Sequence, residues 1–234
     1  KTYQLIGQPD DLEICGLQYD SRQVRDGDLF FCISGFKTDG HLFAAEALKA
    51  GAAALVVERD LVLPQNILQV KVPSSRIAMA ELAAKFYAYP SAKLGLVGVT
   101  GTNGKTTTTY LIKSVLESSF QVGLIGTIGN LIGGQSLPSE RTTPESLDLQ
   151  KLYARMVQAG VDYGVMEVSS HALQLGRVHA SFFDVGVYTN LTQDHLDFHQ
   201  NLSSYRDAKG LLFEMLGKQP KQRKQYAAVN RDDP

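Results

Sequence analysis

The chain has 234 residues, of which 44% are apolar and 20% are charged, a composition typical of a globular protein with a buried core. Its formal net charge is -1, so charge gives no reason to expect binding to nucleic acid or to an anionic membrane surface. Neither terminus has an apolar signal core, and no apolar run is long enough to span a bilayer. Cys15 and Cys32 lack metal-ligand spacing, so reduced thiols in a cytoplasmic protein are expected.

The first part of the chain is predicted to form a small mixed α/β domain. Residues 41–50 have helical periodicity and stop at Gly51, a residue type that commonly ends helices. Apolar runs bounded by turn residues predict three strands, at residues 29–34, 53–57 and 67–72.

A second helix is predicted to begin after Ser74 and Ser75. It should end near Tyr89, because the residue before a proline is pushed out of helical geometry. Residues 89–93 are therefore predicted to link two domains, 1–90 and 91–234.

From Leu94 onward the sequence alternates between strands and helices. The strand-like runs lie at residues 94–100, 122–129, 163–170 and 182–191, and a helix is expected at 107–118. This alternation predicts an α/β domain of the Rossmann-like, phosphate-loop type, with a mostly parallel sheet covered on both faces. Ligands bind such sheets at the carboxyl ends of the strands, where this chain places several polar residues.

The stretch TGTNGKTTTTY, from Thr100 to Tyr110, resembles a phosphate-binding loop but departs from its usual pattern. G-x-x-x-x-G-K-[ST] requires a glycine where this chain has Val99. A glycine-rich loop between a strand and a helix still directs backbone N–H groups toward an anion. Lys105 would reach the terminal phosphates, and the Thr106 hydroxyl would bind a bridging Mg²⁺. The alternative is a simple turn followed by a helix cap.

Three downstream residues bear on the same site. Glu167 ends an apolar strand, where a charge is costly unless it is paired or bound to a metal. His195 follows the next strand, at a position level with Glu167. Lys209 lies on an expected helix, and composition favours a solvated surface side chain there. The histidines expected to be structural are His171, His179 and His199.

Several separated motifs, in this order, resemble those of the Mur ligase family. They are TGTNGKTTT, RTTPE (141–145), MEVSSHAL (166–173), TNLTQDHLDFH (189–199) and YRDAKGLLF (205–213). The segment DSRQVRDGDLFFCISGFKTDGH is similar to the part of the family that holds a uridine nucleotide. The family loop is G-T-N-G-K-[ST], which accounts for Val99. The resemblance covers nearly the whole chain.

The resemblance is greatest to members that add a diamino acid to UDP-MurNAc-L-Ala-D-Glu in peptidoglycan synthesis. It implies an ATP-dependent amide-bond ligase, monomeric and in the bacterial cytoplasm, that forms an acyl phosphate before the amine of meso-diaminopimelate or L-lysine displaces phosphate. Its partners are these substrates, with neither nucleic acid nor a membrane. The residues implied to bind ATP are Gly101, Thr102, Asn103, Gly104, Lys105, Thr106 and Thr107.

The resemblance also implies roles for other residues. The catalytic residues would be Lys105, Glu167, His195 and Lys209. Thr106 and Glu167 would hold one Mg²⁺ and His195 would assist at a second, although histidine is an unusual ligand for so hard a cation. Lys209 matches a lysine that CO₂ carbamylates, which would give Mg²⁺ an anionic oxygen ligand.

Substrate residues are implied in both domains. Those matching the uridine-diphosphate region are Ser21, Arg22, Gly40 and His41, and those matching the muramoyl-dipeptide region are Thr142, Thr143, Ser169 and Arg177. Arg177 suits a carboxylate or phosphate because its donors form a fork. Judged without the family, Ser21 and the two threonines would be turn and cap residues.

Mur ligases have three domains, and this chain is expected to stop within the central one. We therefore expect the 234-residue chain to ligate poorly or not at all, and its sequence leaves open the choice between diaminopimelate and lysine. Three other interpretations are another ligase of the superfamily, an unrelated phosphate-loop NTPase, and a non-catalytic binding module. The second would need an aspartate where the strand ends in Glu167.

Overall fold

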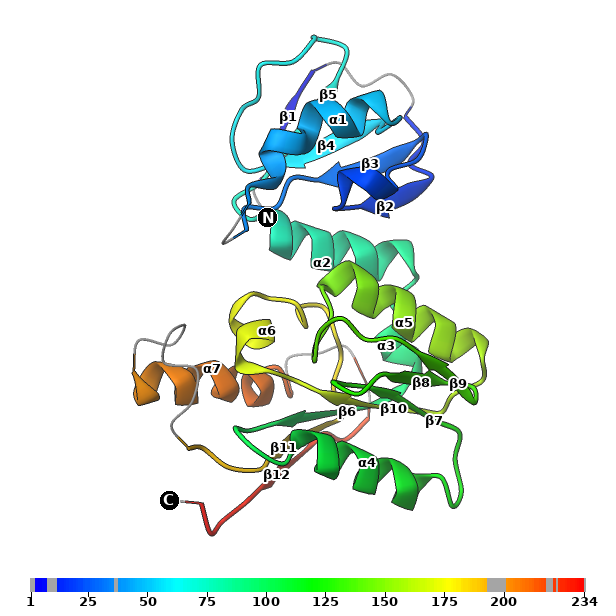
Figure 1. The fold of residues 1–234 in the computed structure, drawn as a ribbon, viewed down its shortest axis with the longest axis vertical. Coiled ribbons are helices and arrows are strands. Elements are labelled where there is room, and N and C mark those ends of the chain that lie inside the picture. The colour runs from blue at the N-terminus through cyan, green and yellow to red at the C-terminus, as the bar shows by residue number, and fades with distance from the viewer. Residues whose placement is uncertain are drawn as a thin grey trace. The chain divides into compact units, whose positions relative to one another are not determined.

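A computed structural model describes residues 3–7, 12–35, 38–192, 201–217, 221 and 223–233 of the chain (Figure 1). The chain divides into two compact units, Lys1–Ala83 and Ala84–Pro234. The division falls within helix α2 (Ser75–Phe86). This helix lies where one was expected to begin after Ser74 and Ser75. Each unit has its own sheet.

The first unit is built on a five-stranded sheet in the order β1-β5-β4-β3-β2. Its strands are β1 (Gln4–Ile6), β2 (Gly16–Gln18), β3 (Asp28–Phe31), β4 (Ala54–Val57) and β5 (Leu68–Lys71). All neighbours pair in parallel except β1 with β5. Its short helices are η1 (Ser21–Gln23), η2 (Gly40–Phe43) and α1 (Ala44–Lys49). The three predicted strands are confirmed, whereas the helix expected at 41–50 begins as a separate 3-10 turn.

The second unit contains a seven-stranded sheet in the order β12-β11-β6-β10-β7-β8-β9. Its strands are β6 (Gly95–Thr100), β7 (Val122–Ile125), β8 (Asn130–Ile132), β9 (Gln135–Leu137), β10 (Tyr163–Glu167), β11 (Val185–Tyr188) and β12 (Tyr226–Val229). Its helices are α3 (Pro90–Lys93), α4 (Lys105–Leu116), α5 (Ser146–Gln158), α6 (Ser170–Gln174) and α7 (Leu202–Glu214). The strands from β12 to β7 pair in parallel, which confirms the predicted α/β class.

Two expectations differ from the structure. Residues 89–93 do not form a plain linker, because Pro90 begins helix α3, where its fixed φ angle favours the first turn. The run at 122–129 is a strand only to Ile125, and the chain then forms an antiparallel hairpin, β8–β9. The turn of that hairpin is Gly133–Gly134, both with positive φ, a signal that sequence reasoning had not used.

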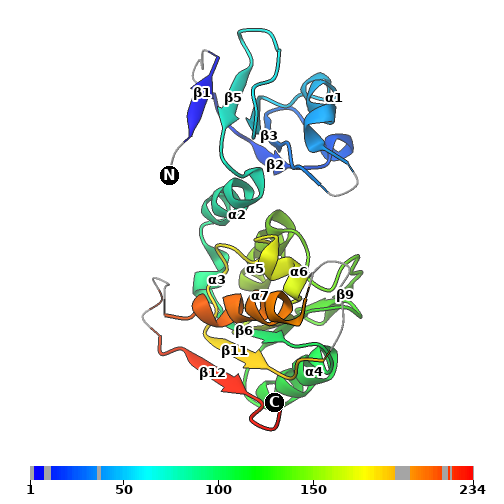
Figure 2. The ribbon, with the colours of Figure 1, turned by 90° about the vertical axis from the view of Figure 1, so that its left-hand side faces the viewer.

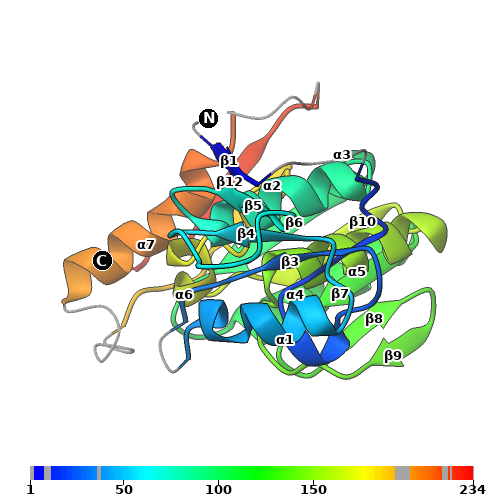
Figure 3. The same ribbon diagram turned by 90° about the horizontal axis from the view of Figure 1, so that it is seen from above.

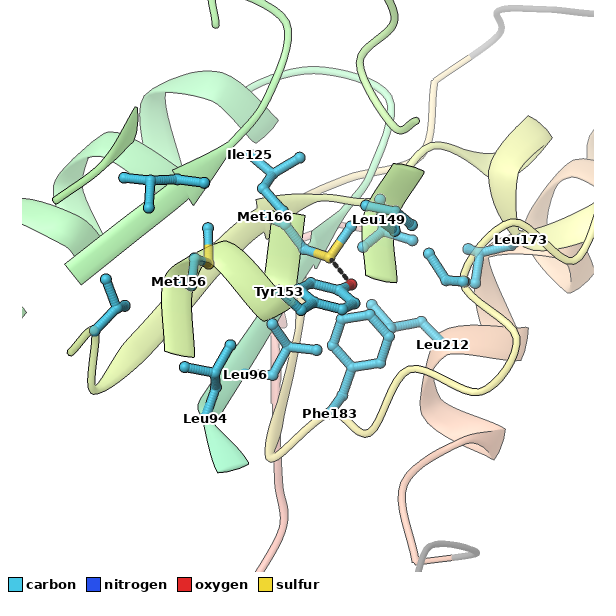
Figure 4. Close-up of a cluster of buried hydrophobic side chains, with 14 residues drawn as sticks. Leu94, Leu96, Ile125, Leu149, Tyr153, Met156, Met166, Leu173, Phe183 and Leu212 are labelled. Atoms are coloured by element: carbon cyan, nitrogen blue, oxygen red, sulfur yellow. Dashed lines mark hydrogen bonds between the residues drawn. The ribbon is translucent and has the colours of Figure 1, made fainter. Parts of the chain in front are cut away.

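Alternate residues of the central strands point to opposite faces of the second sheet and form two apolar cores. On one face, Leu96 and Met166 pack against α5, α6 and α7. On the other, Val97 and Val165 pack against Ile112 of α4. Figure 4 shows the first core, in which the Tyr153 hydroxyl donates to the Met166 sulfur at 3.0 Å. Both faces are therefore covered, as expected for a parallel sheet.

Helices α6 and α7 lie side by side in Figure 2 and Figure 3, so the segment after β10 and the segment near the carboxyl end share one layer. At one edge of the sheet lies β12, which among the described strands pairs with β11 alone, and all four of its residues are exposed. Beside it, α4 leaves an apolar hollow lined by Val97, Thr108, Ile112, Leu116, Tyr163, Val185, Val187 and Ala228.

Candidate functional site

The phosphate-loop residues connect β6 to α4 at the carboxyl edge of the sheet. Helix α4 follows β6 onto one face, whereas α6 follows the adjacent strand β10 onto the other. Loops that leave neighbouring parallel strands in opposite directions open a crevice between them, which is where such sheets bind ligands. The loop after β6 and Glu167, the last residue of β10, lie where these two neighbouring strands end.

Two glycines give the loop its shape. Gly101 has φ +146°, and a Cβ there would lie 1.9 Å from the Thr189 hydroxyl oxygen. Gly104 has φ +82°, a conformation unfavourable for other residues, but a Cβ there would meet no atom within 4 Å. Open space therefore lies beside Gly104, at the start of α4. The first N–H groups of a helix have no intrahelical acceptor and favour an anion at this position.

The Lys105 ammonium lies over the loop. Its Nζ donates to the carbonyl oxygens of Gly101 at 2.9 Å and Thr102 at 2.8 Å. A positive charge is thus held at the amino end of α4, where it adds to the helix dipole. This arrangement attracts anions.

The Glu167 carboxylate is buried and surrounded by donors. It accepts from the Thr106 hydroxyl at 2.9 Å and from the Thr127 backbone N–H at 2.8 Å. The Thr127 hydroxyl adds a third contact at 3.2 Å. Only 1% of Glu167 is exposed, so these bonds offset the cost of burying its charge.

The Glu167 carboxylate and the Thr106 hydroxyl suit a hard divalent cation. Carboxylate and hydroxyl oxygens are the ligands that Mg²⁺ prefers, and Mg²⁺ usually takes its remaining ligands from phosphates and water. The described residues contain no group of three or more histidine, cysteine, aspartate or glutamate side chains that could hold a metal. Glu167 and Thr106 therefore suit a cation that arrives with a phosphate ligand.

Three of the predicted muramoyl-dipeptide residues, Thr142, Thr143 and Ser169, lie near the end of β10. The Thr127 and Thr142 hydroxyl oxygens lie 3.0 Å apart, within hydrogen-bonding distance. The Thr143 hydroxyl donates to the Glu167 carbonyl oxygen at 2.9 Å and accepts from the Ser169 N–H at 3.1 Å. The structure thus joins these threonines and Ser169 to the end of β10.

Arg177 belongs to an ionic cluster that sequence reasoning missed. Its Nη1 donates to the Thr143 carbonyl oxygen at 3.1 Å, and its Nε lies 3.1 Å from the Glu145 carboxylate. Arg141 contacts the same Glu145 oxygen at 2.7 Å. Glu145 is 6% exposed, so one buried carboxylate holds two guanidinium groups. The i, i+4 spacing of Arg141 and Glu145 was the available signal.

Lys209 is buried, contrary to the surface position that composition favoured. It is 2% exposed on α7, with its Nζ 4.1 Å from the centre of the Tyr205 ring. The Tyr205 hydroxyl lies 3.2 Å from that of Thr102 in the phosphate loop. Helix α7 therefore places Lys209 one side chain away from the loop.

His195 and His199 lie outside the described residues, which omit 193–200. The role predicted for His195 stays a prediction. His171 lies on α6, and His179 follows it, both partly buried.

The four predicted uridine-diphosphate residues lie in the first unit. Ser21 and Arg22 form η1, and Gly40 and His41 begin η2; both turns contact α1. Arg22 pairs with Asp20 at 2.7 Å.

The His41 ring is buried and fully engaged inside the first unit. Its Nδ1 lies 2.6 Å from the Asp39 carboxylate, and its Nε2 accepts from the Glu58 N–H. Burial alone would raise the pKa of Asp39, but hydrogen bonds from His41 and Arg59 outweigh it and lower that pKa to about 2. The ring therefore stabilises the turn and has no nitrogen left for a ligand.

No helix within the described parts of the chain is long and apolar enough to cross a membrane.

Comparisons with known proteins agree with this arrangement. A family model described as "Mur ligase middle domain" matches residues 99–234, and one described as "Mur ligase family, catalytic domain" matches residues 13–87. The UDP-N-acetylmuramoyl-L-alanyl-D-glutamate--2,6-diaminopimelate ligase of Geobacillus thermodenitrificans (strain NG80-2) is 53% identical over 230 residues, which are 97% of this chain and 46% of that relative. The ligase of the same name from Syntrophomonas wolfei subsp. wolfei is 50% identical over 234 residues, 100% of this chain and 47% of the relative.

Solved structures give the same result. A structure of a UDP-N-acetylmuramoyl-L-alanyl-D-glutamate--2,6-diaminopimelate ligase matches with a TM-score of 0.76 and 30% identity, over 94% of this chain and 44% of that one. The MurF ligase of Thermotoga maritima, in complex with ADP, matches with a TM-score of 0.65 and 25% identity, over 97% of this chain and 48% of that one. The chain thus spans about half the length of the curated relatives it matches.

The buried ionic cluster yields a stability test. We expect E145A to lower the free energy of unfolding of the second unit by about 3 kcal/mol, because it leaves the largely buried Arg177 guanidinium without its carboxylate. E117A is the matched control, since Glu117 pairs with Lys113 on the exposed side of α4. That change should cost less than about 1 kcal/mol. Urea unfolding measures both, and equal effects would contradict the role given to Glu145.

Proposed function

Because the chain belongs to the Mur ligase family, we propose that it forms the part of an ATP-dependent acid–amino-acid ligase that holds ATP and UDP-MurNAc-L-Ala-D-Glu. The whole protein would add a diamino acid in peptidoglycan synthesis, as a monomer in the bacterial cytoplasm. The relatives named above are 2,6-diaminopimelate ligases, which favours meso-diaminopimelate over L-lysine.

One observation supports this proposal most directly. Glu167 accepts from Thr106 of the phosphate loop and from Thr127, whose hydroxyl contacts Thr142 of the dipeptide region. A site that transfers phosphate to a substrate carboxylate needs both ligands at one place. A single hydrogen-bonded chain connects the groups proposed to bind each.

The proposed reaction has two steps. The terminal carboxylate of the substrate attacks the γ-phosphorus of ATP, and the bond between that phosphorus and the ADP oxygen breaks, which gives an acyl phosphate. The amine of the diamino acid then attacks the acyl carbon. Phosphate leaves, the nitrogen loses a proton, and an amide remains.

Electrostatic stabilisation is the main task of the protein in this reaction. The carboxylate and the phosphates repel one another, so cations and N–H donors must hold them together. Lys105 and the N–H groups at the start of α4 would hold the β- and γ-phosphates. Arg177, which Glu145 orients, would hold an anionic group of the dipeptide.

A bound Mg²⁺ would neutralise phosphate oxygens, and Thr106 and Glu167 are the residues that would hold it. Their oxygen atoms are 2.9 Å apart at the end of β10. His195 and Lys209 remain proposed as groups at a second cation.

The two parts of the chain would divide the binding work. We propose that residues 1–90 hold the uridine nucleotide and that residues 91–234 hold ATP. In the first part, Ser21, Arg22 and the backbone around Gly40 would contact the ligand, because the His41 ring is already engaged.

Calorimetry with the 234-residue chain tests the substrate assignment. We expect UDP-MurNAc-L-Ala-D-Glu to bind at least about 10-fold more tightly than UDP, or ~1.4 kcal/mol, because only the former reaches Arg177 and the threonines. R177A should remove most of this difference. Equal affinity for UDP-MurNAc-L-Ala-D-Glu and UDP, or no binding of either ligand, would refute the proposed substrate. ADP release should be slow or absent, because the relatives are about twice as long, and full turnover would contradict that expectation.

The metal assignment is tested with Glu167→Gln. We expect the Kd for ADP in the presence of Mg²⁺ to rise about 10-fold or more, ~1.4 kcal/mol, while the Kd in EDTA is unchanged or lower, because the variant removes a negative charge beside the phosphates. The control is Glu117→Gln on the exposed side of α4. An E167Q variant that kept the full effect of Mg²⁺ would overturn the assignment.

The carbamylation proposed for Lys209 has its own test. With ¹³C-labelled bicarbonate, MgADP and the wild-type chain, we expect a carbamate carbon signal that is absent from K209R. An intact mass that shows a bare lysine with metal and nucleotide bound would exclude the modification.

A further inference from the structure

The segment Thr189–Thr192, which follows β11, is hydrogen-bonded to the phosphate loop along its length. The contacts are Thr102 N–H to Asn190 O at 2.9 Å, Asn103 N–H to Asn190 Oδ1 at 2.9 Å, Asn190 Nδ2 to Asn103 O at 3.2 Å, Thr189 Oγ1 to Asn103 O at 2.7 Å, Thr192 N–H to Thr102 Oγ1 at 3.0 Å and Asn103 Nδ2 to Thr192 Oγ1 at 3.3 Å. We call this segment the loop support. It fixes two consecutive loop residues from one side.

Asn190 makes contacts that few residue types could reproduce. Its side chain accepts from the Asn103 N–H and donates to the Asn103 carbonyl, while its own carbonyl accepts from Thr102. An aspartate would keep the acceptor but lose the donor, and an alanine would lose both. Asn190 therefore determines the backbone orientation at 102–103.

These bonds also divide the donors of the loop into two groups. The N–H groups of Thr102 and Asn103 are engaged by Asn190. The N–H groups from Gly104 onward begin helix α4, beside the open space at Gly104. The support thus leaves the helical donors to face an anion.

The loop support is itself anchored at its first residue and at its middle. Its first residue continues the parallel pairing of β11 with β6, since the Thr189 N–H donates to Thr100 O at 3.0 Å. Its middle is held by Asp233, whose carboxylate accepts from the Leu191 N–H at 2.9 Å and the Tyr188 hydroxyl at 2.7 Å. The support is therefore a fixed part of the sheet edge.

The loop support also bears on Val99, which stands where the usual phosphate-loop pattern has its first glycine. Val99 is fully buried in β6 and pairs with Val187 on one side and Glu167 on the other. The strand therefore extends through the position where the usual pattern has a glycine. The remaining loop, Gly101–Gly104, is short and takes its shape from the neighbouring segment.

We propose that Asn190 is a positioning residue that holds the phosphate loop in the conformation that binds a nucleoside diphosphate. The identity of that ligand rests on the proposed function. Asn190 acts through Thr102 and Asn103.

The test compares N190A with N130A in the 234-residue chain. Asn130 is a buried asparagine of β8 in the same unit, and its side chain donates to Pro138 O, away from the loop. The first readout is amide hydrogen exchange at Thr102 and Asn103 without nucleotide. The second is the Kd for MgADP.

We expect N190A to speed exchange at the Asn103 amide, whose side-chain acceptor it removes, about 10-fold or more and to raise the Kd for MgADP by a similar factor, because the helical donors lose their fixed orientation. The Thr102 amide should change less, because its acceptor is the backbone carbonyl of residue 190. N130A should leave both readouts unchanged even where it lowers the Tm. N190D should protect the Asn103 amide better than N190A does, because an acceptor remains.

Exchange at Asn103 that is unchanged in N190A would overturn the proposal, as would wild-type affinity for MgADP in that variant. If the wild-type chain bound no MgADP, the proposed function would fail. The exchange measurement would then still decide whether Asn190 positions the loop.

Discussion

The buried carboxylate of Glu167 is the constraint on which the rest of the site depends. A charge with 1% exposure is tolerated only with partners, and its three contacts come from two places: Thr106 at the start of α4, and the backbone and side chain of Thr127 after β7. Meeting that requirement forces the ends of β6, β7 and β10 into one arrangement. The Glu167 carbonyl extends the same arrangement to Thr143.

The parallel sheet makes this convergence possible. In a parallel sheet the carboxyl ends of all strands reach one edge, so residues far apart in sequence meet there. Asn190 and Asn103 are 87 positions apart, yet they exchange two hydrogen bonds. The two apolar cores hold the strands in register, and this fixes which polar residues meet at the carboxyl edge of the sheet.

The sequence predicted the elements with strong local signals. Apolar runs and the turn residues that bound them predicted the strand, loop and helix from β6 to α4. They also predicted the end of a strand at Glu167 and the α/β class. The contacts of Glu145 with Arg177 and of Asn190 with Asn103 were not predicted, because each joins residues that only the tertiary fold brings close. Composition favoured a surface position for Lys209, because the sequence around a lysine on a helix does not indicate that it is buried. Nothing in the sequence indicated that Asp39 and Glu58 engage the ring of His41 within the fold.

Strand β12 has a consequence for the behaviour of this chain in solution. All four of its residues are exposed, and its outer edge presents backbone groups that are not paired within the described sheet. Such an edge is a template for strand addition by another molecule. The basic residues Arg223 and Lys224 precede it, and like charges keep two such edges apart at low ionic strength.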